Sequence, residues 1–159
     1  MTLTFTDAGL LTPAEGIETN LEAIGEYFVK TFPQSQTRGR LFENYRRYLG
    51  RFQEEVFPWF EMWVDGSFVT LKENPKDIDV VTFLDWEVYE LREKSLEKFL
   101  GFNFETQGLD AYIVAAYPEN HLEFGNFINT RNRWEETFIN NRGKGKKGFL
   151  KLQFGKFAE

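Results

Sequence analysis

Residues 63–81, which read WVDGSFVTLKENPKDIDVV, decide the fold of this chain. The mostly apolar residues before Gly66 predict a β-strand over residues 59–65, and the Gly66-Ser67 pair predicts the turn that ends it. A second strand is predicted over residues 77–84, which are apolar apart from a few polar side chains. The stretch therefore predicts two strands with a glycine turn after the first of them.

Two carboxylates, Asp77 and Asp79, begin the second predicted strand. Residues two apart in a strand point to the same face, so these carboxylates lie together while Ile78 and Val80 face the core. The two negative charges repel each other, and burial would add a desolvation cost. A bound divalent metal relieves both effects. The alternative is a solvated strand end at which Asp77 caps the backbone.

The Gly66-Ser67 turn is a candidate phosphate site. Gly66 has no side chain, so the backbone can come close to a phosphate group. Ser67 is predicted to begin a short helix over residues 67–72, where N–H groups and the helix dipole favour an anion. The alternative is an ordinary strand-to-helix turn.

Asp110 is the third candidate carboxylate. It stands at the mouth of the apolar run 109–117, which is predicted to be a buried central strand because it is apolar on both faces. If that strand lies beside residues 77–84, three carboxylates meet at one end of the sheet. Such a cluster can hold two metal ions about 3.5–4 Å apart. The alternative is a strand-edge residue without a ligand.

The remaining patterns complete an α/β (α+β) order of elements, with a mixed sheet flanked by helices. A single domain over residues 1–159 is expected, because this length suits one core. It is divided into an irregular arm (1–16), a helical part (17–57) and the core sheet with its helices (58–159). Helices are predicted over residues 20–30, 35–56, 67–72, 86–100 and 130–140, and strands over residues 59–65, 77–84, 109–117 and 147–154. The arginines of the long second helix, among them Arg38 and Arg40, are predicted to form its solvated face.

Composition limits the chemistry. The net charge of −6 disfavours a broad cationic surface for duplex DNA. The chain has no Cys, which excludes disulfides and thiolate chemistry, and its one His, His121, cannot build a histidine zinc site. A bound metal is therefore expected to be Mg²⁺ or Mn²⁺. The first residues lack a signal-peptide pattern and no apolar run approaches ~20 residues, so a cytoplasmic protein without a membrane segment is expected.

The pattern Gly66-Ser67, nine residues, then Asp77-Ile78-Asp79 with a later Asp110 resembles the signature of the nucleotidyltransferase superfamily of the DNA polymerase β type. More closely, the chain is similar from end to end to an uncharacterised family of small bacterial nucleotidyltransferase-like proteins. One departure is the acidic Asp65 directly before the glycine, where the superfamily has an apolar residue.

The resemblance implies roles for these residues. Gly66 and Ser67 would bind the triphosphate of an NTP, Asp77 and Asp79 would hold Mg²⁺ or Mn²⁺, and Asp110 would be a third ligand or a general base. The reaction would move NMP from an NTP to an acceptor hydroxyl on a protein, an RNA end or a small molecule. A toxin or antitoxin partner fits small members of the superfamily. The alternatives are a non-catalytic binding or regulatory partner and a metal-dependent phosphohydrolase.

Two further groups of cations are candidates for anion contacts. Lys72 and Lys76 lie between the turn and the second strand and can meet phosphate oxygens, or they can be solvated loop lysines. The basic run 140–148 can guide a polyphosphate or an RNA acceptor, or it can be a solvated turn.

Overall fold

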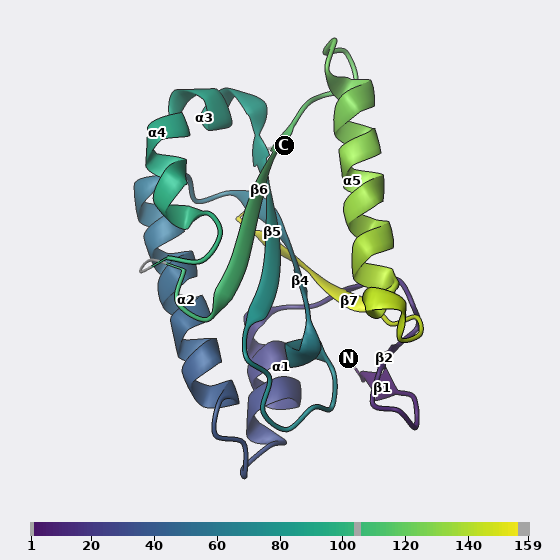
Figure 1. Cartoon of the computed structure of the whole chain (residues 1–159). Helices are drawn as coiled ribbons and strands as arrows, with labels where there is room; N and C mark the ends of the chain where they lie inside the picture. Colours follow the sequence, from purple (N-terminus) through teal and green to yellow (C-terminus); the bar gives the residue numbers. More distant parts are fainter. Residues whose placement is uncertain (1, 104–105, 156–159) are drawn as a thin grey trace.

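A five-stranded mixed sheet forms the centre of the protein in the computed structural model, which describes residues 2–103 and 106–155 (Figure 1). Its strands follow the order β3-β7-β4-β5-β6. The central strand β4 is antiparallel to β5 and β7, whereas the outer pairs β3–β7 and β5–β6 are parallel. This confirms the predicted mixed sheet. The strands are β3 (Gly16–Glu18), β4 (Phe60–Asp65), β5 (Ile78–Asp85), β6 (Leu109–Ala116) and β7 (Phe149–Phe154).

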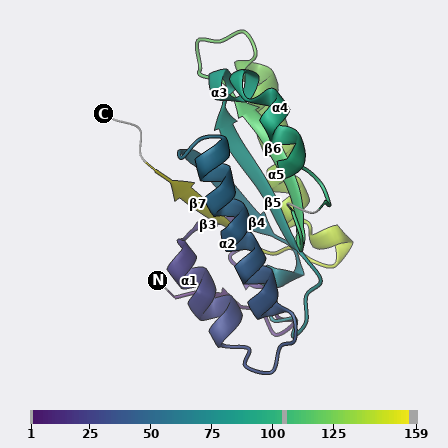
Figure 2. The ribbon, with the colours of Figure 1, turned by 90° about the vertical axis from the view of Figure 1, so that its left-hand side faces the viewer.

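Helices cover both faces of this sheet. On one face lie α1 (Leu21–Gly25), which continues into a π-helical turn (Glu26–Lys30), and α2 (Arg38–Glu55) (Figure 2). On the other face lies α5 (Phe124–Ile139), which begins earlier than the predicted helix over residues 130–140. The predicted helix over residues 86–100 is broken into three short pieces: α3 (Trp86–Leu91), α4 (Glu93–Leu96) and a 3₁₀ turn (Glu97–Phe99).

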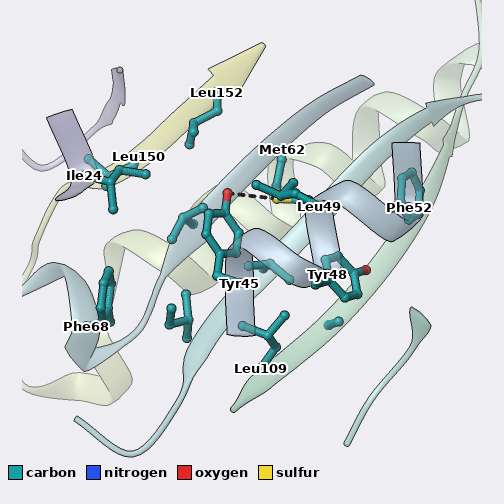
Figure 3. Packing of buried hydrophobic residues seen from close by; sticks show 14 of the residues in the cluster. Ile24, Tyr45, Tyr48, Leu49, Phe52, Met62, Phe68, Leu109, Leu150 and Leu152 are labelled. Carbon is teal, nitrogen blue, oxygen red and sulfur yellow. Dashed lines mark hydrogen bonds between the residues drawn. The ribbon is translucent and has the colours of Figure 1, made fainter. Parts of the chain in front are cut away.

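The larger core lies between α2 and the sheet (Figure 3). The predicted apolar face of α2 is confirmed, since Leu41, Leu49 and Phe52 are all buried. Two buried tyrosines keep their hydroxyl groups hydrogen-bonded, which offsets the cost of burying them. Tyr45 donates to Sδ of Met62 at 3.2 Å, and Tyr48 donates to a backbone carbonyl at 2.9 Å.

A smaller aromatic core fills the space between α5 and the sheet. The ring of Trp63 lies 4.7 Å from that of Phe83 and 5.0 Å from that of Phe149, measured between centroids. Phe138 from α5 packs on Phe149 at 5.6 Å. Along β5, Val81 and Phe83 therefore face α5, whereas Ile78, Val80 and Leu84 face α2.

The prediction of an irregular arm over residues 1–16 is wrong. Strands β1 (Thr4–Phe5) and β2 (Leu11–Thr12) form an antiparallel hairpin, and β3 begins at residue 16 and joins the main sheet beside β7. The two-residue strands are too short for an alternating pattern to reveal them. Their register depends on side-chain contacts such as the 2.8 Å hydrogen bond between the hydroxyls of Thr4 and Thr12.

The prediction that residues 109–117 form a central strand is also wrong, because β6 is the edge of the sheet. Ile113 packs against the α2 core and Val114 against the α5 core. The strand is apolar on both faces because helices cover both faces, and that pattern is the same for an edge strand and a central one. Tyr112 on this strand is 41% exposed.

None of the helices within the described ranges combines the length and the apolar character needed to cross a membrane.

Candidate active site

Three aspartates form a row across three neighbouring strands. The β4–β5 pairing places Asp65 opposite Asp79, and the β5–β6 pairing places Asp79 beside Asp110. Paired residues share one face of a sheet, so all three carboxylates lie on the face that α5 covers. The expectation that Asp110 lies on a strand next to Asp79 is confirmed, whereas Asp65 was not predicted to join the row.

The row lies in a cavity of about 910 Å³. The structure brings every predicted site residue to the lining of this cavity: Gly66, Ser67, Lys72, Lys76, Asp77, Asp79 and Asp110. Ile78 and Val80 are fully buried on the opposite face of β5, as the alternation of the strand predicts. The turn, the carboxylates and the two lysines therefore share one space.

Gly66 meets two structural demands at once. Its φ is +90°, a conformation that side chains other than glycine rarely adopt. A Cβ at this position would also lie 3.1 Å from Oδ2 of Asp79, tighter than an ordinary contact. The absence of a side chain at Gly66 is what gives the Asp79 carboxylate its space.

The predicted helix over residues 67–72 is a single 3₁₀ turn, Ser67–Val69. Thr70 closes this turn, because its backbone N–H and its hydroxyl both donate to the carbonyl of Ser67, at 3.2 and 2.6 Å. The backbone then becomes extended at Thr70. One 3₁₀ turn has almost no macrodipole, so the expected contribution of a helix dipole at Ser67 is absent.

Arg38 holds the segment after this turn, and the prediction that it is solvated is wrong. Its guanidinium is fully buried and donates to the carbonyls of Phe28 at 2.9 Å and Phe68 at 2.7 Å. It also donates to the carbonyls of Thr70 at 2.7 Å and Lys72 at 2.5 and 3.1 Å. Charged donors form strong hydrogen bonds with carbonyls, so one side chain fixes the path of residues 68–72. Helical periodicity did not indicate this role, since an arginine at that position is usually exposed.

Burial controls the charge of the aspartate row. Burial first, and then the neighbouring Asp77 and Asp110 carboxylates, raise the pKa of Asp79 to about 6, while Arg142 opposes them. Burial also raises the pKa of Asp110. Tyr112 donates a hydrogen bond to Oδ2 of Asp110 at 3.3 Å, which acts in the opposite direction. The row therefore carries a desolvation cost that a bound cation would offset.

Lys147 was missed as a site residue. Its ammonium forms an ion pair with Oδ1 of Asp65, and both side chains are almost completely buried at the cavity. Burial lowers the pKa of Lys147 to about 7, while the contact with Asp65 favours the charged form. The pair neutralises one end of the aspartate row. The lysine lies at the start of one predicted strand and the acid at the end of another, and nothing in the sequence pattern indicates that the two residues pair.

One side of α5 forms another wall of the cavity. Thr130, Trp134 and Phe138 recur at helical spacing along it, with Arg133 and Thr137 beside them. The following 3₁₀ turn, Asn141–Gly143, adds Arg142 to the lining. The basic run predicted over residues 140–148 therefore reaches the same cavity as the carboxylates.

The lining is richer in positive charge than the chain as a whole. Among residues 2–103 and 106–155, six cationic and four anionic side chains line the cavity, although the net charge of the chain is −6. The cations are Lys72, Lys76, Arg133, Arg142, Lys144 and Lys147. An anion is therefore drawn to this cavity rather than to the surrounding surface.

The donor set at the row suits a hard cation in its chemistry, because it consists of carboxylate oxygens. In residues 2–103 and 106–155, however, no three carboxylate or imidazole side chains converge closely enough to hold one ion as they stand. Asp77, Asp79 and Asp110 share the cavity and interact electrostatically. For these three carboxylates to bind one ion jointly, their side chains would have to turn toward one another.

Fold and site thus define a mixed α/β protein with a row of aspartates in a cation-rich cavity. The chain belongs to a family of unknown function, DUF6932, which matches residues 3–153. No curated protein and no solved structure matches it.

Proposed function

We propose that the protein is a metal-dependent nucleotidyltransferase, which moves NMP from an NTP to an acceptor hydroxyl. The observation that carries this proposal is the pairing of Asp79 with Asp110 on adjacent strands, beside the Gly66-Ser67 turn in one cavity. Neighbouring carboxylates can hold the metal ions that assist displacement at phosphorus, and a glycine turn lets a phosphate approach the backbone. The positive excess in the lining supports a polyphosphate as the ligand.

In this proposal, Asp77 and Asp79 would hold Mg²⁺ or Mn²⁺, and Asp110 would act as the general base beside them. A metal ion held there would neutralise charge on the phosphate oxygens and favour in-line displacement. The Gly66-Ser67 turn lets the triphosphate approach the backbone, and Lys72 and Lys76 balance its charge.

The chemical step exchanges one phosphorus–oxygen bond for another. The acceptor oxygen forms a bond to the α-phosphorus, and the bond from that phosphorus to the bridging oxygen breaks, so pyrophosphate leaves. The proton of the acceptor hydroxyl moves to a carboxylate oxygen of Asp110, which acts as the general base. A raised pKa suits a base near neutral pH, and that of Asp110 is raised.

Calorimetry tests the donor site. The wild-type chain is titrated with Mg²⁺ and a non-hydrolysable analogue of each NTP. The expected result is binding that Asp77→Asn and Asp79→Asn each weaken at least about tenfold, because loss of one carboxylate removes a metal ligand. Glu54→Gln is the matched control, since it removes an exposed carboxylate on α2, outside the cavity. Absence of binding, or equal binding by the Asp variants, contradicts the proposal and favours the non-catalytic partner.

Labelled NTP separates transfer from hydrolysis. With label at the α-phosphate, transfer leaves the label on the acceptor and releases unlabelled pyrophosphate. A phosphohydrolase releases the γ-phosphate and attaches nothing. Proteins that co-purify with the chain are the first acceptors to try, because a toxin or antitoxin partner is part of the proposal.

A further inference from the structure

The cations of the cavity come from two separate segments. Lys72 and Lys76 lie between the 3₁₀ turn and β5, whereas Arg133, Arg142 and Lys144 come from α5 and the turn after it. The sixth cation, Lys147, is already paired with Asp65. The cavity therefore has a second cationic segment, on α5, besides the one next to the Gly66-Ser67 turn.

Arg142 in the second segment is held in an unusual backbone conformation. Its φ is +55° and that of Asn141 is +45°, although neither residue is a glycine. The guanidinium is exposed and lowers the pKa values of Asp79 and Asp110, so it acts on the aspartate row. Within the described part of the chain it forms no ion pair with them or with another carboxylate. Its charge is thus available to a ligand next to the row.

An aromatic surface lies between this segment and the third carboxylate. The rings of Tyr112 and Trp134 are 4.8 Å apart, and Trp134 packs on Phe138 at 5.5 Å. Phe138 is buried and supports the ring of Trp134, while Tyr112 is 41% exposed. The Tyr112 hydroxyl meets Asp110 at 3.3 Å, so the aromatic surface begins at the proposed general base.

We propose that the α5 wall binds the acceptor, and that the acceptor is a nucleotide unit. Its phosphate would contact Arg142 with Arg133 or Lys144, and its base would stack on Trp134 and Tyr112. Aromatic rings beside arginines are how proteins bind unpaired nucleotides, because every base offers a face for stacking. This inference rests on the proposed function and names the acceptor that the resemblance leaves open.

The charge of the chain limits how much nucleic acid can bind. The cations of the α5 wall are Arg133, Arg142 and Lys144, and they can neutralise only a few phosphates. The protein as a whole carries a net charge of −6. A long strand would meet repulsion beyond the cavity. The acceptor unit is therefore a free ribonucleotide or the last nucleotide of a single strand.

The test measures binding of AMP, of the dinucleotide pApA and of a 12-nucleotide single strand by calorimetry, in the presence of Mg²⁺ and tripolyphosphate. Arg142→Ala and Trp134→Leu are each expected to weaken the binding of AMP roughly five- to a hundredfold, the range that loss of one stacking or charged contact gives. Trp134→Leu, which removes no charge from the cavity, should leave the binding of Mg²⁺ and tripolyphosphate within about twofold. Arg40→Ala, which removes an exposed arginine of α2, is the matched control.

The two sources of the nucleotide unit give different results. If the acceptor is free, AMP binds at least as tightly as the strands. If it is a strand end, pApA binds more tightly than AMP, and the 12-nucleotide strand adds nothing further. Unchanged AMP binding in both variants overturns the inference.

Competition separates the acceptor from the donor. AMP should remain bound when a non-hydrolysable NTP with Mg²⁺ is added, because the two occupy different walls. Displacement of AMP by the NTP overturns the inference, since the aromatic surface then serves the donor base. Failure of the proposed function is seen separately, as absence of tripolyphosphate binding by the wild type and by Asp79→Asn alike.

Discussion

A Cβ placed on Gly66 would lie 3.1 Å from Oδ2 of Asp79. The turn therefore has no room for a side chain beside the central carboxylate of the row. The backbone at Gly66 adds a second constraint, because its φ of +90° is unfavourable for any other residue.

Gly66→Ala is therefore expected to lower the free energy of unfolding by about 1–3 kcal/mol, the usual cost of a residue in a disfavoured backbone region. It should also weaken the binding of Mg²⁺ and NTP by displacing Asp79. Urea denaturation measures the first effect and calorimetry the second. Gly50→Ala is the control: that glycine lies inside α2 with nothing within 4 Å of an added Cβ. It should raise stability by about 0.5–1 kcal/mol.

Asp79→Asn is expected to stabilise the protein at pH 7.5 while weakening the proposed binding of Mg²⁺ and NTP. Burial raises the pKa of Asp79 in the folded state from 3.8 to about 6, so the folded protein holds this proton more tightly than the unfolded chain does. The wild type therefore loses stability as the pH rises from about 4 to 6, by up to about 3 kcal/mol. The asparagine variant lacks this loss.

Urea denaturation of both proteins at several pH values measures the difference. The stability advantage of Asp79→Asn should be near zero at pH 4 and reach its full size above pH 6. Glu54→Gln should show no such change. An advantage that does not grow over this range would mean that Asp79 carries no desolvation cost.

Arg38→Met is expected to lower the free energy of unfolding by at least about 3 kcal/mol, because four backbone carbonyls lose their buried donor. Arg38→Lys should recover only part of this, since an ammonium cannot reach all four carbonyls. Hydrogen exchange should become faster at residues 68–72 in both variants. If hydrogen exchange became faster only in α2, Arg38 would stabilise that helix and not residues 68–72.

Lys147→Met is expected to cost about 3–5 kcal/mol, because it leaves the buried Asp65 carboxylate without its counter-charge. Adding Asp65→Asn to that variant should restore part of the loss. A double-mutant cycle measured by urea denaturation gives the coupling between the two residues. Additive effects of the two changes would show that the buried pair is not coupled.

Much of the fold follows from hydrophobic periodicity. The long helix, both strands around Gly66 and the alternation of Asp79 with Ile78 and Val80 were all predicted from local pattern. Periodicity reports which faces of an element are covered. It does not report which strands lie at the edge, and this is why the placement of β6 at the centre was wrong.

The candidate site was predicted most fully where its residues are close in sequence, and Asp110 was added as the acid next to a separate apolar run. Gly66, Asp77 and Asp79 lie within one short stretch, and their shared side of β5 follows from the strand itself. The pairing of β4 brings Asp65 to the cavity. The turn and the chain after α5 bring Arg142 and Lys147. These long-range placements depend on the sheet order, which single-sequence patterns do not specify.

Among the described residues, β7 follows the other strands in sequence, yet it lies between β3 and β4. While the chain is being synthesised, both of these earlier strands present unpaired backbone groups to the solvent until residues 149–154 leave the ribosome. Closure of the sheet is therefore a late event, with contacts that span most of the sequence. Topologies with such long-range strand pairing fold more slowly than those with local contacts, and they leave strand edges unpaired until the sheet closes.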